Sequence, residues 1–412
     1  MSGDLFSFSA TETGYNHIKA DKVCEDASGN YDDELVHVCV VADGHGSDNY
    51  PRTDRGSKFA VSAAIEQIRE FVNSVYNPVP EDSERKSPES SELISKILSD
   101  NFTETHPLKG LSLSILSRWH ELVEDDFEKN PFTEEELKSV SERYRNKYLS
   151  EKERSIEKAY GSTLIVYAVT ESFSFGLQIG DGKCVVINAD GEFIEPIPWD
   201  ENCQLNITTS LCDADAGNEF RFYVSSEKPA AVFAGSDGVD DSYAGEEELF
   251  ALYRSMLKIF TEHGDDIGKS EIKDYLPVLT KKGSGDDVSV ALIINPGKIQ
   301  KLAEVFNIET ELFNLQNKLK EKEHAIIVNE EKEKNLLAKL SPAIRFGYRL
   351  LIDNNIIDQI NDLRSQRNEL EDEISAIHRE TDELIDRLQK ARKISDDTLA
   401  ISVVPGVTGQ LF

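Results

Sequence analysis

The sequence is poor in basic residues, with 45 lysine and arginine residues against 77 aspartate and glutamate residues and a formal net charge of −32. A chain this acidic repels phosphate backbones and anionic membrane faces, so we expect neither nucleic acid nor a membrane as a partner. Acidity alone promotes solubility, but clustered carboxylates can also gather divalent cations. The motifs must therefore decide whether the charge has a chemical role.

Cysteine and long apolar runs are also scarce. The five cysteines are odd in number and show no CxxC or zinc-type spacing, which favours a reducing cytosol and small hydrophobic roles. No apolar run approaches the ~18 residues that span a bilayer. The first residues lack a basic stretch followed by an apolar one. We therefore predict a cytoplasmic protein.

What the sequence does contain, up to residue 296, is a mixture of short β-rich runs and amphipathic stretches. Such a mixture predicts an α+β layered domain over residues 1–296, with a mobile polar loop at 77–92 (NPVPEDSERKSPESSE). The expected strands are Leu35–Ala42, Ser162–Val169, Phe173–Ile179, Lys183–Ala189, Ala230–Ala234 and Val288–Ile294. The expected helices are Gly56–Tyr76, Ile115–Lys129, Glu134–Ala159 and Glu246–Thr261.

Composition changes beyond residue 296, where glycine nearly disappears. Apolar residues at alternating steps of four and three predict a coiled-coil hairpin over 298–395, with Lys322, Arg367 and Thr381 interrupting its two seams. Pro342 and Gly347 could turn the chain between the arms. Two helices packed on the first domain, or a seam between two copies, are the alternatives. The apolar tail 396–412 could add a strand or dock on a partner.

The chemistry centres on residues 38–50, VCVVADGHGSDNY, where an apolar strand candidate ends on Asp43. The two oxygens of Asp43 can bridge cations, Gly44 lets a main-chain carbonyl approach the same ion, and His45 is a titratable neighbour. An isolated DGHG is more often an ordinary turn. The metal-site hypothesis therefore depends on further carboxylates.

Further carboxylates lie beside other strand candidates: Glu25 and Asp26 in CEDAS, Asp237 in FAGSDGVDDS and Asp286 in GSGDDVSVALII. A sheet sandwich could bring them to one edge, where like charges repel unless a cation neutralises them. Oxygen ligands without cysteine or histidine suit Mg²⁺ or Mn²⁺ rather than zinc. We interpret Gly161-Ser162-Thr163 as a packing element at the start of a strand, and Asp240 and Asp241 as solvated turn residues.

Six blocks occur in a fixed order over about residues 14–295: CEDAS, VVADGHGS, YGSTLIVYAV, LQIGDGKCVVINADG, FAGSDGVDDS and GDDVSVALII. As an ordered set they resemble the blocks of the type-2C metal-dependent (PPM-type) protein serine/threonine phosphatases. The opening HIK and CEDA, together with the segment from Trp119 to Phe132, are similar to the bacterial branch of that family.

The resemblance implies a four-layer α-β-β-α sandwich of two antiparallel sheets, with two Mn²⁺ or Mg²⁺ ions in a cleft and a weak third. It implies that Asp43 bridges both ions, that Gly44 offers its carbonyl and that His45 is the general acid. The remaining implied ligands are Asp237 and Asp286 for the first ion, Glu25 or Asp26 for the second, directly or through water, and Asp181 with Asp237 for the third.

One position departs from the family. An arginine that grips the substrate phosphate usually lies five residues before the aspartate of the ED pair, and Asp21 occupies that position here. Lys22 and Arg52 are our leading substitutes, and the other basic candidates nearby are His17, Lys19 and Arg55. A lysine lacks the two-point fork of an arginine.

The prediction is therefore a metal-dependent phosphatase that hydrolyses phosphoserine and phosphothreonine by attack of an activated water. A catalytically weak or silent scaffold is the alternative from another class, favoured by the missing arginine, and a small-molecule phosphatase is an alternative among enzymes. The predicted partners are a phosphoprotein substrate, a cognate protein kinase, and a coiled-coil partner or second copy.

Overall fold

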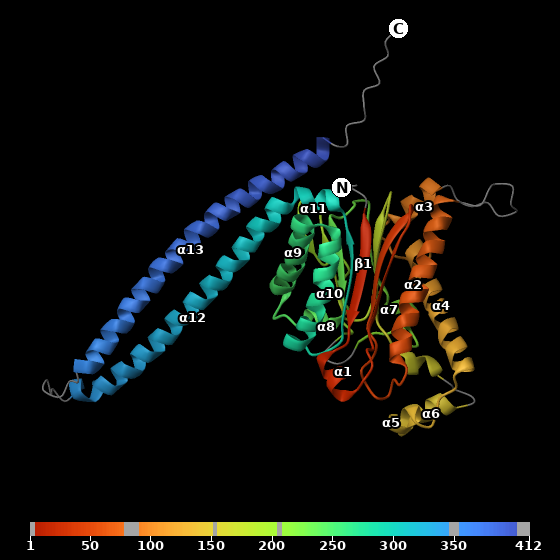
Figure 1. Ribbon diagram of the computed structural model, residues 1–412, viewed down its shortest axis with the longest axis horizontal. Helices are drawn as coiled ribbons and strands as arrows, with labels where there is room; N and C mark the ends of the chain where they lie inside the picture. Colours follow the sequence, from red (N-terminus) through yellow and green to blue (C-terminus); the bar gives the residue numbers. More distant parts are fainter. Residues whose placement is uncertain (1–4, 78–89, 151–154, 204–207, 346–353, 402–412) are drawn as a thin grey trace, which may run out of the picture. The chain divides into compact units, whose positions relative to one another are not determined.

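The computed structural model describes residues 5–77, 90–150, 155–203, 208–345 and 354–401. Two compact units divide the chain, Met1–Lys301 and Leu302–Phe412, and Figure 1 labels their elements. Most of the predicted loop 77–92, the turn residue Gly347 and residues 402–412 of the predicted tail lie outside the described ranges.

The first unit is built on two five-stranded antiparallel sheets (Figure 1). One sheet has the order β1 (Phe6–Glu12), β10 (Val288–Ile294), β9 (Ala231–Gly235), β6 (Lys183–Ile187) and β7 (Phe193–Ile194). The other has the order β2 (Ala27–Asp32), β3 (Val36–Ala42), β4 (Leu164–Thr170), β5 (Ser174–Ile179) and β8 (Arg221–Ser225).

Strand β3 shows why the two sheets stack, because its alternate side chains enter two different cores. Val38, Val40 and Ala42 belong to the core that one sheet forms with its helices. Cys39 and Val41 belong to the core between the two sheets, which also contains residues of β4, β6, β9 and β10. Such a strand is buried on both faces and reads as a continuous apolar run.

Helices cover the outer face of each sheet. Helices α2 (Thr53–Tyr76) and α4 (Pro107–Lys129) pack together, and α2 lies on β2, β3 and β4. Helices α9 (Glu246–His263) and α10 (Asp265–Lys282) pack together on the other side, where α10 contacts β1 and β10. The predicted four-layer α-β-β-α sandwich is confirmed.

Shorter helices complete the first unit: α1 (Tyr15–Ala20), α3 (Ser90–Ile97), α5 (Glu136–Ser139), α6 (Glu142–Leu149), a 3₁₀ turn η1 (Ile156–Tyr160), α7 (Ala216–Glu219), α8 (Asp237–Asp240) and α11 (Pro296–Lys301). The single helix predicted for 134–159 is wrong. Extended backbone at Val140 and Ser150 interrupts it, with ψ angles of 131° and 130°.

None of the helices in the described ranges has the length and apolarity that crossing a bilayer requires.

The second unit consists of α12 (Ala303–Arg345) and α13 (Asn354–Ile401), which pack against each other. Early residues of α12 meet late residues of α13, as in the cluster of Ile308, Leu315 and Leu384, so the pair is antiparallel. Helix α12 continues through Pro342, which therefore does not end the arm as predicted. Helix α13 also includes the first residues of the predicted tail.

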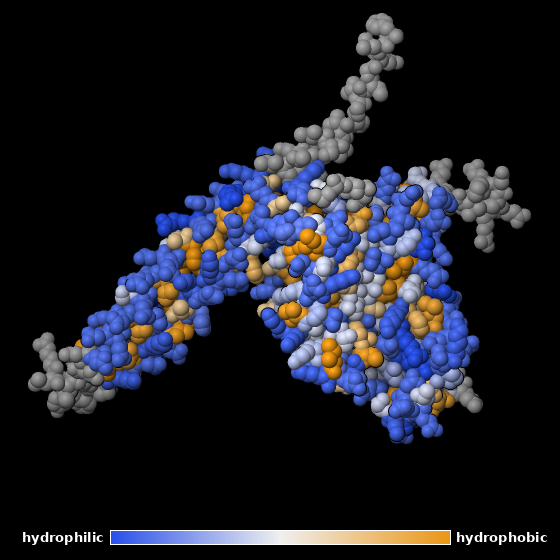
Figure 2. Space-filling view, in the orientation of Figure 1, coloured by the Kyte–Doolittle hydropathy of each residue, from blue (hydrophilic) through white to orange (hydrophobic). Residues whose placement is uncertain are grey.

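Ion pairs between the two helices explain the polar residues in the predicted seams. Arg367 donates to Glu333 at 3.3 Å, and Lys322 pairs with Glu373. Thr381 instead donates its hydroxyl to the main chain of its own helix, at Ile377. Most of the visible surface of this hairpin is hydrophilic (Figure 2), with exposed apolar residues such as Ile327 scattered over it.

Candidate metal centre and active site

An acidic cleft of about 780 Å³ opens at the ends of the strands in the first unit. Its lining includes the carboxylates of Glu25, Asp43, Asp181, Asp213, Asp237, Asp241, Asp286 and Asp287. The only basic side chains that line it, among the described residues, are those of His17 and His45. The structure therefore brings most of the predicted ligands to one place, and it brings no lysine or arginine with them.

Asp43 lies directly after β3, and the Gly161-Ser162-Thr163 segment holds its backbone. The amide of Asp43 donates to the hydroxyl of Thr163 at 3.0 Å, and the amide of Thr163 donates to the carbonyl of Asp43 at 2.8 Å. Gly44 pairs with Ser162 in a short bridge. A Cβ atom at Gly44 would lie 2.4 Å from the carbonyl oxygen of Glu25. Close approach of two chain segments thus requires glycine here.

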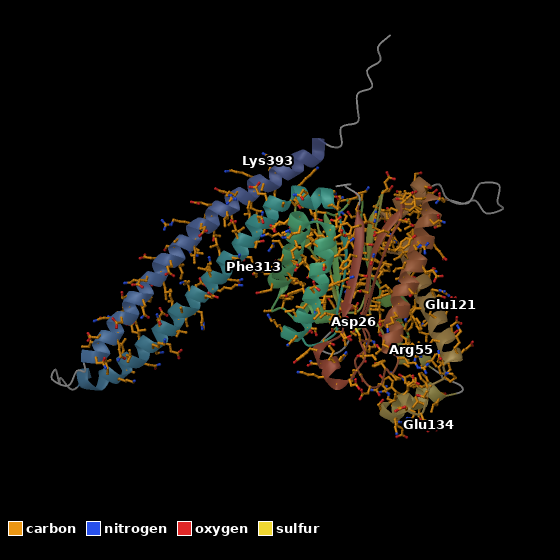
Figure 3. The ribbon with its side chains drawn as sticks, in the orientation of Figure 1. Asp26, Arg55, Glu121, Glu134, Phe313 and Lys393 are labelled. Atoms are coloured by element: carbon orange, nitrogen blue, oxygen red, sulfur yellow. The ribbon has the colours of Figure 1, made fainter. Side chains whose placement is uncertain are left out.

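Three aspartates lie close together at the cleft. Asp26 is buried, whereas Asp43 and Asp237 line the cleft and are partly buried. Asp43 interacts electrostatically with both Asp237 and Asp26, the latter labelled in Figure 3. Burial raises the pKa of Asp43 well above its usual range and raises the pKa of Asp26 to about 8. Burial, together with the charges of neighbouring aspartates, raises the pKa of Asp237 to about 6.

These pKa shifts have one physical origin, because buried like charges are unfavourable without a counter-charge. One oxygen of Asp26, Oδ2, is buried and has no hydrogen-bond partner. A divalent cation would satisfy that oxygen and would let all three carboxylates ionise. The donor set is therefore suited to Mg²⁺ or Mn²⁺.

Asp181 approaches the same centre from the loop between β5 and β6. Gly180 before it adopts a φ of 107°, which favours glycine, and its amide donates to the hydroxyl of Thr209 at 3.0 Å. Burial raises the pKa of Asp181. The position suits a further cation ligand next to Asp237.

Asp286 and Asp287 precede β10 but have different surroundings. The Asp286 side chain is 57% exposed, whereas that of Asp287 is 3% exposed. Asp287 accepts the amides of Gly14 and Glu25, both at 2.6 Å. Its oxygens therefore hold the backbone that presents Glu25. Burial raises the pKa of Glu25 to about 7.

His45 forms part of the cleft wall. Its Nε2 atom lies 2.8 Å from the hydroxyl oxygen of Ser210, and its ring meets Tyr50 edge-on. Burial lowers the pKa of His45 to about 4, although the charge of Asp213 opposes this shift. The imidazole is thus neutral at pH 7. A phosphate dianion bound beside it would raise that pKa by pairing with the imidazolium.

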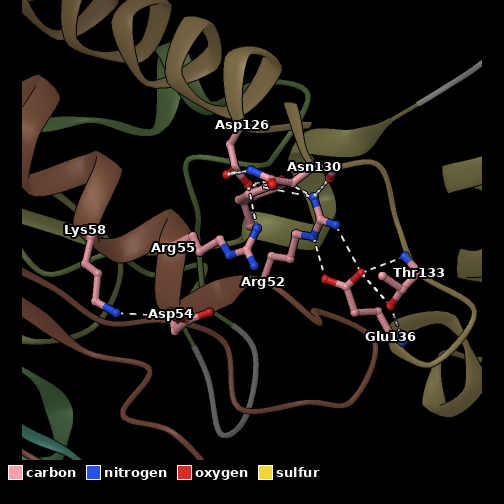
Figure 4. Close-up of polar contacts among 9 residues, drawn as sticks. Arg52, Asp54, Arg55, Lys58, Asp126, Asn130, Thr133 and Glu136 are labelled. Atoms are coloured by element: carbon pink, nitrogen blue, oxygen red, sulfur yellow. Dashed lines mark hydrogen bonds and ion pairs between the residues drawn. The ribbon is translucent and has the colours of Figure 1, made fainter. Parts of the chain in front are cut away.

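Arg52 does not line the cleft, contrary to the prediction that it contacts substrate. It is 2% exposed, and its guanidinium donates to both oxygens of Glu136, to the carbonyl of Asn130 and to the hydroxyl of Tyr160 (Figure 4). Because these bonds occupy four of its five donors, Arg52 is a structural residue.

The other basic candidates differ in their neighbours. Arg55 pairs with Asp126 at 3.0 Å (Figure 4), and Lys19 lies over the ring of Tyr15. Lys22 is exposed and lies 3.6 Å from Asp48. Its charge partly opposes the rise in the pKa of Glu25 that burial causes. Lys22 is thus close to the cleft without lining it, whereas His17 lines it.

Several cleft residues escaped the sequence interpretation. Asp241 lines the cleft, but it is exposed and lies in a turn, as predicted. Asp240 instead belongs to α8, and burial raises its pKa to about 8, so the prediction of a solvated turn residue is wrong for Asp240. Ser210 and Asp213 come from the segment before β8, which carries no recognisable motif. Among the residues that the sequence interpretation missed, only Asp240 and Asp241 had a sequence signal, which is their position three and four residues after Asp237.

Comparison with known proteins adds one decisive finding. Residues 13–277 match the family model described as Protein phosphatase 2C. No curated protein matches the chain.

Three solved structures illustrate the similarity among known folds. "PppA, a key regulatory component of T6SS in Pseudomonas aeruginosa" is 14% identical, with 70% of this chain and 97% of that chain covered and a TM-score of 0.42. The catalytic domain of the serine threonine protein phosphatase PstP with two manganese ions is 14% identical, with 70% and 97% covered and a TM-score of 0.38. RsbX with magnesium is 11% identical, with 70% and 94% covered and a TM-score of 0.36.

Proposed function

The chain belongs to the protein phosphatase 2C family, and from this premise we propose that it is a metal-dependent protein serine/threonine phosphatase. The observation that carries the proposal is the convergence of the carboxylates of Asp43, Asp237 and Asp286 on one cleft, next to a buried oxygen of Asp26 that has no hydrogen-bond partner. A silent scaffold has no physical need to keep so many like charges together.

We propose the cation ligands that the family resemblance implies. Asp43, with the carbonyl of Gly44, would hold two cations, Asp237 and Asp286 would hold one of them, and Glu25 or Asp26 would hold the other. Asp181 with Asp237 would hold a third ion weakly. When bound, the cations would lower the pKa of a water that attacks phosphorus and would neutralise the phosphoryl oxygens.

The protein's own groups would complete the reaction. Asp43 would fix the positions of the reacting groups, because β3 and the contact with Thr163 hold its backbone. His45 would give a proton to the departing serine or threonine oxygen, which is a poor leaving group as an alkoxide. The neutral state of His45 means that it must first gain that proton, and the negatively charged phosphate favours this step.

The binding of the substrate phosphate depends mainly on the cations. We propose Lys22 as an additional contact of the substrate phosphate. Lys22 acts electrostatically on Glu25 but does not line the cleft. A phosphoprotein substrate follows from this activity. A cognate kinase, a coiled-coil partner or second copy, and a cytoplasmic location stay predictions.

Hydrolysis of p-nitrophenyl phosphate and of a phosphothreonine peptide tests the proposal. The wild type, Asp43→Asn and Asp237→Asn are compared in EDTA, Mg²⁺ and Mn²⁺, and Asp125→Asn, an exposed residue of α4, is the matched control. We expect activity that needs Mn²⁺ or Mg²⁺, is unchanged in the control and falls at least about 10²-fold in both cleft variants. Inactivity with every metal, in a protein that still binds Mn²⁺, would favour the scaffold.

A further inference from the structure

His17 lies at the α1 side of the cleft with three carboxylates around its ring. Its Nδ1 atom is 3.0 Å from Oδ1 of Asp287. Its Nε2 atom is 3.8 Å from Oε2 of Glu25 and 4.0 Å from Oδ1 of Asp286. The His17 side chain is 14% exposed, so these groups meet in a partly desolvated space.

Main-chain contacts hold α1, and with it His17, against the segment before β10. The amide of Asn16 donates to the carbonyl of Gly285 at 2.9 Å, and the amide of Tyr15 donates to the hydroxyl of Thr280 at 2.8 Å. Any Cβ at Gly14 would lie 2.5 Å from the carbonyl carbon of Asp286. The ring is therefore placed by rigid backbone and not by a free side chain on the surface.

Asp287 determines the tautomer of the His17 ring, and therefore which ring nitrogen can accept or bind a cation. A carboxylate that already accepts two amides accepts from Nδ1–H as well, which leaves the lone pair of a neutral imidazole on Nε2. That lone pair then faces the carboxylates of Glu25 and Asp286. Three acceptors facing one another repel unless a proton or a cation lies between them.

The spacing suits a cation better than a hydrogen bond. Distances of 3.8 and 4.0 Å exceed hydrogen-bond length. The Nε2–Asp286 distance is shorter than twice a typical metal–ligand distance of about 2.1 Å. His17, Asp286 and Asp287 each offer a ligand atom, and these atoms lie within 4.8 Å of one another. An imidazole whose other nitrogen is held by a carboxylate is a recurrent arrangement in metal sites, where the carboxylate fixes the ring.

We propose that His17 binds a divalent cation through Nε2, together with Asp286, and that Asp287 is the residue that positions its ring. The inference rests on the proposed metal centre and adds a nitrogen to a ligand set that the sequence predicts to be all oxygen. Imidazole favours Mn²⁺ and later transition metals over Mg²⁺. One of the basic candidates for the role of the missing arginine, His17, would thus be a metal ligand and not a phosphate clamp.

Pulsed electron paramagnetic resonance of the full chain loaded with Mn²⁺ tests this directly, because it detects a nitrogen bonded to the ion. The spectra of protein with ¹⁵N-labelled and unlabelled histidine are compared for the wild type, His17→Gln and His45→Gln. His37→Gln is the matched control, since Nδ1 of His37 meets Asp32 at 2.7 Å but His37 does not line the cleft. Thermal unfolding of each variant verifies that it is folded.

We expect a histidine nitrogen coupling that persists in His37→Gln and His45→Gln and disappears in His17→Gln. Affinity for Mn²⁺ should fall about 10- to 100-fold in His17→Gln, and affinity for Mg²⁺ should fall less. Bound Mn²⁺ without histidine coupling in the wild type would overturn the inference and leave the phosphatase proposal intact. Absence of Mn²⁺ binding in the wild type would overturn both.

Discussion

Arg52 and Glu136 form a two-point ion pair, in which Nε lies 2.7 Å from Oε1 and Nη2 lies 3.0 Å from Oε2. The Arg52 side chain is buried, and its guanidinium also lies over the ring of Phe132, 4.5 Å from its centroid. The pair joins the residue before α2 to the segment that begins α5 (Figure 4).

Arg52→Met should destabilise the protein, because it leaves the Glu136 carboxylate without its partner. Breaking a buried pair costs about 3–5 kcal/mol, and we expect the lower end because the Glu136 side chain is 22% exposed. Urea unfolding measures the loss. Lys58→Met, which removes an exposed pair with Asp54, is the control and should cost less than about 1 kcal/mol. Equal costs would contradict this account of Arg52.

Acid should weaken the same contact. Burial alone would raise the pKa of Glu136, but hydrogen bonds from Arg52 and Thr133 outweigh it and lower the pKa from 4.5 to about 2. A depressed folded-state pKa contributes stability that is present above pH 4.5 and is lost as the pH falls toward 2. The unfolding free energy of Glu136→Gln should therefore depend less on pH between 4.5 and 2 than that of the wild type. Parallel pH profiles would contradict this.

Metal removal should destabilise the protein more at high pH than at low pH. In the metal-free state the pKa values of Asp26 and Asp237 are raised to about 8 and about 6. A carboxyl group whose pKa is higher in the folded state than in the unfolded state favours folding while it is protonated. This contribution to stability is fully present below the ordinary pKa of 3.8 and is lost as the pH rises through the folded-state pKa. The melting temperature in EDTA should therefore fall between pH 5 and 8, and the gain on adding Mn²⁺ should be larger at pH 8.

Asp26→Asn provides the comparison for this experiment, because Asp26 has a higher pKa than Asp237. Its melting temperature in EDTA should vary less with pH than that of the wild type. A gain from Mn²⁺ that is the same at pH 5 and pH 8 would show that the buried carboxylates do not control metal-linked stability.

Loss of His45 should depend on the leaving group. His45→Gln should lower kcat for a phosphothreonine peptide by about 10²–10⁴-fold, the usual contribution of a general acid. It should affect p-nitrophenyl phosphate far less, because nitrophenolate leaves without a proton. Steady-state kinetics with both substrates measures the difference. Equal losses would instead indicate that His45 positions other groups, for example through Ser210.

In the hairpin, Glu333→Ala should loosen the packing of α12 on α13. Glu333 is 8% exposed and accepts from Arg364 at 2.6 Å and from Arg367 at 3.3 Å, so its removal leaves two arginines without their shared partner. Hydrogen exchange of the full chain should become faster around these residues. Glu311→Ala, which removes an exposed pair with Arg387 at 3.9 Å, should change exchange little. Unchanged exchange in both variants would contradict a stabilising role for Glu333.

Much of the fold was predictable because its signals are local. The apolar run of β3 and the seams of α12 and α13 follow from spacing along the chain. Other elements lack such signals. Strand β2, ASGNYD, is mostly polar, and pairing with β3 supports it. Helix α10 contains Pro277, and its packing on α9 and β1 outweighs the weak local preference.

By itself, the sequence determined that carboxylates would follow or precede several strands, and that Gly44 would accompany Asp43. Only the tertiary structure decided which groups enter the cleft. It placed His17 beside Glu25 through the docking of α1, and it buried Arg52 against Glu136 and so removed it from the substrate. The reason is that strand periodicity depends on neighbours along the chain, whereas the partners of a charged side chain depend on long-range packing and burial.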